Sequence, residues 1–177
     1  NKPVVSIAAE ESKLDATIYT ILRVREAAQQ EIRLIKNGKF KDVQRANVKL
    51  AIRYMLKNYR LADAFIAASA LLEDNSKRVA AGEAGERAVE NLYTILEYFD
   101  ASDVQNLKVG TYDSMAGKEG LVLAGLDSVK NNIDEFLAFF PSTEVESMRN
   151  KILEENELNR KEWDPKLGEI VNLPSAI

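Results

Sequence analysis

Basic side chains recur at helical spacing in one segment of this chain. Six of them follow one another at steps of four or three residues: Lys41, Arg45, Lys49, Arg53, Lys57 and Arg60. Because an α-helix turns by about 100° per residue, residues at this spacing are expected on one side of a helix. The window from 33 to 60 holds nine Lys or Arg and one acidic residue, Asp42. The pattern predicts a basic surface that binds a negatively charged partner.

This basic segment belongs to an acidic chain. The 177 residues carry 24 Lys or Arg and 28 Asp or Glu, a net charge of -4. Residues 1–75 hold 13 basic and 9 acidic groups, whereas residues 76–177 hold 11 and 19. Such segregation of charge favours a docking protein over an enzyme. The overall negative charge also disfavours a nucleic-acid-binding domain, which is usually basic overall.

The residue types that most active sites need are missing. The chain has no His and no Cys, which excludes Cys nucleophiles, Ser-His-Asp triads, Cys/His zinc sites and haem ligation by His. Glycine-rich phosphate-binding motifs are also absent. Carboxylate pairs, Lys and Tyr remain, but carboxylates spread over amphipathic helices are mostly solvated. We therefore expect a protein that is not an enzyme, with no catalytic residues, no cofactor and no metal ligands.

Three apolar residues lie among the basic ones: Ile52, Leu56 and Tyr59. A solvated helix face usually mixes charges of both signs to avoid repulsion between residues four apart, and it gains nothing from apolar side chains. We expect these three residues to anchor a protein partner after an electrostatic encounter. The alternatives are an ordinary solvated face, or coverage by the N-terminal arm or the C-terminal tail of this chain.

Helical periodicity dominates the first half of the chain. Residues 1–10, with Pro3 and several β-branched residues, are expected to form an extended arm, and a helix is predicted from Ser12 to about Asn37. A single helix of about 50 Å is predicted over 41–74. Its core stripe is expected to be Val43, Leu50, Tyr54, Leu61, Phe65, Ala68 and Leu72, with the basic series opposite.

The middle of the chain combines a helix with the longest connection. Asn75 or Ser76 is expected to cap a helix that reaches about Phe99. Gly82 and Gly85 lower the helix propensity there, and they fit either a close backbone approach or a frayed first turn. The Gly-rich stretch over 100–120 is predicted to be irregular apart from one short helical turn.

The last two helices have clear limits. One apolar face predicts a helix that Pro141 ends: Val122, Leu126, Val129, Ile133, Phe136, Leu137 and Phe140. A thinner apolar stripe predicts an outer helix from Ser142 or Thr143 to about Glu162, with Thr143 and Glu146 forming a capping box. Residues 163–177 contain two prolines and no helical period, so an extended tail is expected.

Together these elements predict a single all-α domain over residues 1–177. We expect an antiparallel, up-down four-helix bundle with an extended N-terminal arm (1–10), an extra C-terminal helix and an extended tail (163–177). The chain has no run of about 18 apolar residues, so no transmembrane segment is expected.

Two stretches resemble a known family. The string from Ile52 through Asp100, and LVLAGLDSVKNNIDEFLAFFP at 121–141 after a turn-rich link, are similar to the PsbQ-like proteins, extrinsic lumenal subunits of photosystem II. Members of that family are four-helix bundles with a basic face and an extended N-terminal arm. The similarity is strongest from Ile133 to Pro141. Because the region after Pro141 departs from the compact plan of the family, an algal, PsbQ'-like member fits best.

This resemblance implies a non-catalytic protein of the chloroplast thylakoid lumen, peripheral to the membrane. It implies docking on photosystem II and help in retaining the ions of the oxygen-evolving site. Two alternatives remain: an assembly factor or adaptor of the same fold that binds an acidic protein, and a nucleic-acid-binding module that sets the basic helix against phosphates. In each case the expected binding residues are the six basic and three apolar residues named above.

Overall fold

The computed structural model describes residues 4–37, 42–109, 119–170 and 172–174. Helices make up all of its regular elements within these ranges, so the all-α prediction is confirmed. In chain order they are α1 (Val4–Lys36), α2 (Asp42–Lys57), α3 (Leu61–Ser69), α4 (Asn75–Val109), α5 (Glu119–Leu137), α6 (Ser142–Glu162) and a short 3-10 helix, η1 (Pro165–Leu167).

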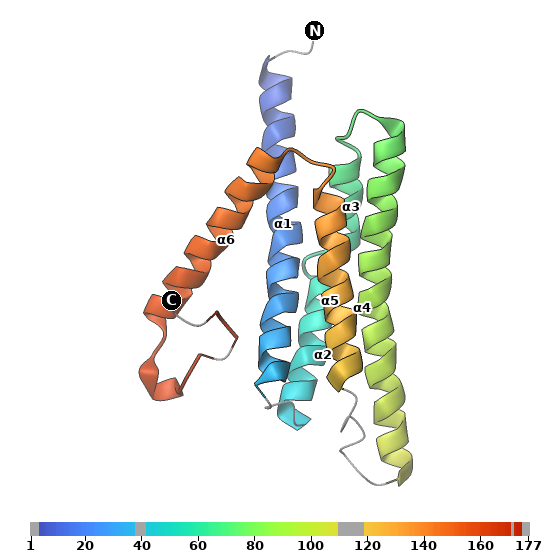
Figure 1. Ribbon diagram of the computed structural model, residues 1–177, viewed down its shortest axis with the longest axis vertical. Helices are drawn as coiled ribbons and strands as arrows, with labels where there is room; N and C mark the ends of the chain where they lie inside the picture. The colour runs from blue at the N-terminus through green and yellow to red at the C-terminus, as the bar shows by residue number, and fades with distance from the viewer. Residues whose placement is uncertain (1–3, 38–41, 110–118, 171, 175–177) are drawn as a thin grey trace.

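The helices form a bundle-like arrangement (Figure 1). Helices α1, α4 and α5 run side by side, and α2 and α3 follow one another along the remaining side, where both contact α1 and α4. In the view of Figure 1, α1 and α4 run downward, whereas α2, α3 and α5 run upward. Helix α6 departs from the end of α5 and descends at an angle beside α1, on the outside of the other helices, as its thin apolar stripe predicts.

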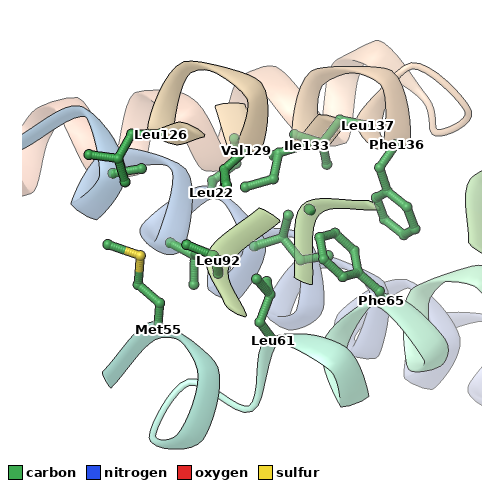
Figure 2. Packing of buried hydrophobic residues seen from close by; sticks show 14 of the residues in the cluster. Leu22, Met55, Leu61, Phe65, Leu92, Leu126, Val129, Ile133, Phe136 and Leu137 are labelled. Atoms are coloured by element: carbon green, nitrogen blue, oxygen red, sulfur yellow. The ribbon is translucent and has the colours of Figure 1, made fainter. Parts of the chain in front are cut away.

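Most of the core side chains come from α1 to α5 (Figure 2), and α6 adds Val145 and Ile152. Every residue of the apolar face that the sequence predicts between Val122 and Phe140 is buried, which confirms that prediction. From the opposite side, α4 contributes Leu92 and α3 contributes Phe65. The ring of Phe65 meets that of Phe136 edge to face, with 4.7 Å between ring centroids. The aromatic contact therefore joins α3 to α5 across the core.

The N-terminal prediction is wrong over its described part. Helix α1 begins at Val4, so most of the expected extended arm is helical, and Ser12 lies within a helix instead of capping one. The physical reason is that no Gly or Pro occurs between Val4 and Asn37. The β-branched residues near the start lower helix propensity by only a few tenths of a kcal/mol each, which a long helix tolerates.

The single helix expected over 41–74 is also wrong, because the chain breaks between α2 and α3. Arg60 adopts a left-handed backbone conformation with φ 50° and ψ 52°. A non-glycine residue in this conformation costs about 1 kcal/mol or more, and neither Gly nor Pro marks the break in the sequence. Burial of Leu61 and Phe65 immediately after it offsets that cost.

The region predicted to be irregular is helical in its first half. Helix α4 continues past Phe99 to Val109, while residues 110–118 lie outside the described ranges. The cap of α4 is Asp74 instead of Asn75 or Ser76, because the Asp74 carboxylate accepts hydrogen bonds from the backbone N–H groups of Ser76 and Lys77 at 2.8 and 3.3 Å. The Ser76 hydroxyl also donates to this carboxylate, at 2.6 Å. This bond, together with the two backbone bonds, lowers the pKa of Asp74.

Helix α6 starts at Ser142 as predicted, but the capping box is absent. The Thr143 hydroxyl donates to the neighbouring Glu144 carboxylate at 2.6 Å, and no side chain caps the helix. Beyond α6, the described part of the tail folds back toward α1. The Trp163 indole donates to the Gly168 carbonyl at 2.8 Å, and Arg33 donates to the Asn172 carbonyl at 3.2 Å. The tail is therefore not a freely extended segment in its described part.

A charged cluster joins α1, α5 and α6. The Arg25 guanidinium donates two hydrogen bonds to the Asp134 carboxylate, at 2.7 and 2.8 Å, and Arg149 of α6 lies 3.6 Å from the same carboxylate. Burial alone would raise the pKa of Asp134, but the hydrogen bond and charge of Arg25, with the charge of Arg149, outweigh it and hold the pKa below its ordinary value. We assign this cluster a structural role.

Candidate docking surface

The basic series does not stay on one face of α2. Val48, Ile52 and Met55 are fully buried and define the inner side of the helix. Each step of four residues advances by about 40° beyond a full turn, so the series rotates by about 120° between Arg45 and Lys57. Arg45 is accordingly half-buried at the edge of the inner side, whereas Lys57 is exposed at the end of α2. Lys41 lies outside the described residues.

Lys49 and Arg53 lie close to an acidic residue of α4. Lys49 Nζ lies 2.7 Å from an oxygen of Asp100 on α4, and Arg53 lies 3.9 Å from the same oxygen. The hydrogen bond from Lys49 is the main reason that the pKa of Asp100 is lowered. Lys49 therefore helps to hold α2 against α4, and its charge is partly neutralised there.

Arg60 is separated from the other basic residues by the break that follows α2. It leads into α3, and its guanidinium lies 2.7 Å from the carboxylate of Asp63 in the first turn of that helix. Both side chains are exposed, so this ion pair contributes little to stability. The structure thus does not bring the six basic residues together as one stripe.

The three apolar residues expected on the outer face lie inward. Ile52 is 0% exposed and belongs to the core, so its assignment to the outer surface is wrong. Leu56 and Tyr59 are half-buried and pack against the same core. The reason is that Val48, Ile52 and Met55 form an apolar stripe at spacings of four and three, and this stripe faces α1 and α4. The helical core of this protein therefore covers these residues, which is a different cover from the N-terminal arm or C-terminal tail considered from the sequence.

The exposed face of α2 instead carries two residues that the sequence placed in the core. Leu50 is 60% exposed and Tyr54 is 53% exposed, so their assignment to the core stripe is wrong. The Tyr54 ring meets the half-buried Tyr59 ring edge to face at 5.3 Å, which restricts its orientation. The sequence also contains the competing stripe through Val48, Ile52 and Met55, but helical periodicity alone does not show which of the two stripes faces the core.

Leu50, Arg53, Tyr54 and Lys57 share this outer side of α2, and we refer to them as the α2 docking surface. All four residues are exposed. At about 100° per residue they fall within an arc of about 100° on the helix. The surface thus combines two large apolar side chains with two cations, one of which, Arg53, lies near Asp100. It can accept an apolar contact that is flanked by negative charge.

A second feature is an apolar groove between α3 and α4. It encloses about 420 Å³ and is lined by apolar and small residues with a few polar ones at its margin: Ala62, Phe65, Ile66, Ser69, Ala70, Arg78, Gly82, Gly85, Glu86, Val89 and Glu90. This volume lies within the range of about 300–1,000 Å³ that is typical of small-molecule sites. No pattern in the sequence indicated this groove.

Comparisons with known proteins identify no relative of this chain. No family model, no curated protein and no solved structure matches it. Over the described ranges, no helix is long and apolar enough to cross a bilayer. Within the same ranges, Asp and Glu side chains form no group of three or more that could hold a metal ion.

Proposed function

We propose that this protein is a non-catalytic docking subunit that binds an acidic protein surface through the α2 docking surface. The observation that carries the proposal is the exposure of Leu50 and Tyr54 on a helix whose opposite side is already buried. Large apolar side chains flanked by cations are typical of interface anchors, whose burial supplies most of the binding energy. In this proposal α1, α2 with α3, α4 and α5 are the four members of an up-down four-helix bundle, and α2 and α3 act as one interrupted helix.

Charge favours a protein partner over nucleic acid. Binding to phosphates relies on several Lys or Arg side chains directed to the backbone of the nucleic acid, whereas Lys49 and Arg53 of α2 lie against Asp100. A protein surface that offers an apolar contact flanked by carboxylates, by contrast, matches the two apolar and two cationic side chains of the α2 docking surface.

The specific partner that we propose is the lumenal face of photosystem II, with the thylakoid lumen as the location and ion retention at the oxygen-evolving site as the role. This part of the proposal rests on the resemblance of residues 52–100 and 121–141 to the PsbQ-like proteins. It agrees with an all-α protein that lacks a membrane-crossing helix in its described part.

Binding of the full chain to photosystem II membranes stripped of their extrinsic subunits by high salt tests the proposal. Leu50→Ser should weaken binding by about five- to thirtyfold, as expected for loss of an interface anchor. The matched control is Leu153→Ser on α6, since Leu153 is 59% exposed and Leu50 is 60% exposed. The control should bind within about twofold of the parent, because surface substitutions away from an interface change little.

Charge reversal separates the electrostatic part of the interaction. Lys57→Glu should weaken binding at low salt, and the difference from the parent should shrink at high salt, because exposed charges are screened over about 8–10 Å. Lys161→Glu, an exposed lysine on α6, is the matched control. Equal losses for the α2 and α6 variants would contradict the α2 docking surface. A parent protein that does not bind the stripped membranes would contradict photosystem II as the partner.

A further inference from the structure

The exposed side of α4 is acidic where this helix lies beside α2. Four exposed residues follow one another there at steps of three and four: Glu90, Tyr93, Glu97 and Asp100. At about 100° per residue they fall within an arc of about 80° on the helix. No Lys or Arg occurs between Arg87 and Lys108, so no basic residue of α4 interrupts this side. We refer to the four residues as the α4 acidic face.

The charge of this face differs from that of the outer helix α6. On α6, acidic and basic residues alternate within one turn, as in the pair formed by Glu146 and Arg149 at 3.4 Å. On α4, the preceding cation Arg87 lies 2.8 Å from Glu135 of α5. Tyr93 is 49% exposed and places a large ring among the carboxylates. The α4 acidic face therefore combines an apolar group with negative charge, whereas the α2 docking surface combines apolar groups with positive charge.

The two surfaces adjoin on neighbouring helices. Arg53 of the α2 docking surface lies 3.9 Å from Asp100 of the α4 acidic face. Helices α2 and α4 contact each other and run in opposite directions (Figure 1). One side of the molecule thus carries a basic half on α2 and an acidic half on α4. Such a side is complementary to itself, because a twofold rotation places the basic half of one copy over the acidic half of the other.

We propose that two copies of this chain associate through this side, and that the α2 docking surface of each copy contacts the α4 acidic face of the other. The inference rests on the proposed function, because the second copy occupies the same α2 residues when the acidic partner is absent. Large apolar side chains at the centre of a contact and opposite charges around them are the usual anchors and guides of protein association.

A twofold axis across the bundle gives these contacts a definite register. It reverses the direction of α4, which then runs parallel to α2 of the other copy. Pairing Lys57 with Glu97 of the second copy brings Tyr54 opposite Tyr93, because each Tyr lies about one turn before the charged residue of its own helix. The same pairing occurs twice in the dimer, so each substitution in it acts twice.

Sedimentation equilibrium of the full chain at low salt, over micromolar to submillimolar concentrations, tests the dimer. We expect the parent to be in equilibrium between monomer and dimer. Lys57→Glu or Glu97→Lys alone should weaken the dimer by about tenfold or more, since like charges then meet at both contacts. The matched controls on α6 are Lys161→Glu and Glu154→Lys, both at exposed positions, and they should stay within about twofold of the parent. A parent that remains monomeric would overturn the proposal.

Mixing the two variants provides a sharper test. In a mixed dimer of Lys57→Glu with Glu97→Lys, opposite charges meet at both contacts, so the mixture should dimerise within about threefold of the parent although neither variant does so alone. The double variant, with both substitutions in one chain, should dimerise likewise. Circular dichroism verifies that each variant is folded. Failure of both the mixture and the double variant to dimerise would contradict the pairing of α2 with α4.

Tyr93→Ser separates the dimer from the proposed function. It should weaken the dimer by about tenfold or more, as expected for loss of an interface anchor at both contacts, and leave binding to the stripped membranes undiminished, because Tyr93 is not part of the α2 docking surface. Leu50→Ser should weaken both. A monomeric parent whose membrane binding depends on Leu50 would contradict the dimer and support the proposed function. A dimer that depends on Leu50 and Tyr93, in a protein that does not bind the membranes, would support the dimer and contradict photosystem II as the partner.

Discussion

Two glycines three residues apart in α4 are expected to respond to alanine in opposite directions. At Gly82 a Cβ atom would meet nothing within 4 Å. At Gly85 it would lie 2.7 Å from Cγ and 2.9 Å from Cβ of Phe65, closer than real Cβ contacts. Both positions have helical backbone, so both gain the same intrinsic helix propensity from Gly→Ala, about 1 kcal/mol. Only the packing differs between them.

The packing penalty at Gly85 should exceed the propensity gain. Phe65 is buried and its ring contacts Phe136 at 4.7 Å between centroids, so it has little freedom to withdraw. Overpacking of a close-packed core costs about 1–3 kcal/mol, and disturbing an aromatic pair costs about 0.5–1.5 kcal/mol more. We therefore expect Gly82→Ala to stabilise the protein by about 1 kcal/mol and Gly85→Ala to destabilise it by about 1–2 kcal/mol.

Urea unfolding followed by circular dichroism measures both changes. The slope of the free energy of unfolding against urea should be the same for the parent and both variants, so that the midpoints report stability alone. The two variants should differ by about 2–3 kcal/mol. If Gly85→Ala matched Gly82→Ala within about 0.5 kcal/mol, Phe65 would have room to move, and the close approach of α3 to α4 would not be what requires glycine.

Three further predictions concern single residues. Burial raises the pKa of the Glu31 carboxyl to about 7, so the folded state binds its proton more tightly than the unfolded state. This stabilisation is complete below about pH 4.5 and is lost as the pH rises through 7. In paired urea titrations, Glu31→Gln should therefore exceed the parent in stability by about 1–3 kcal/mol at pH 8 and by little at pH 4. An equal difference at both pH values would contradict this reasoning. Arg60→Gly should raise the free energy of unfolding by about 0.5–1 kcal/mol by relieving the left-handed conformation, whereas Arg53→Gly within α2 should lower it by about 1 kcal/mol; a loss of stability at Arg60 would show that its ion pair with Asp63 outweighs the strain. Ile52→Ser should cost about 2–4 kcal/mol because Ile52 is fully buried, and a change below about 0.5 kcal/mol in thermal unfolding would return Ile52 to the surface.

The sequence alone was sufficient for the last two long helices. In α5 the large apolar residues repeat at helical spacing on one face, so that face must point to the core. Pro141 follows and prevents the helix from continuing. The structure confirms that face and the start and end of α6.

The orientation of α2 was decided by tertiary packing. Its sequence contains two apolar stripes, one through Val48, Ile52 and Met55 and the other through Leu50 and Tyr54, and periodicity alone does not rank them. Packing against α1 and α4 buries the first stripe and leaves the second exposed. The choice of stripe changes the expected docking residues from Ile52, Leu56 and Tyr59 to Leu50 and Tyr54.

The break at Arg60 and the α3–α4 groove likewise have no local signal. Arg60 is ordinary in a helical sequence, and its left-handed conformation becomes tolerable only because burial of Leu61 and Phe65 directly after it is worth more than the strain. Ser69 and Gly82 are common residue types whose neighbours come from different helices. Helical periodicity indicates which residues avoid water, whereas the shape of the groove arises only when α3 lies against α4.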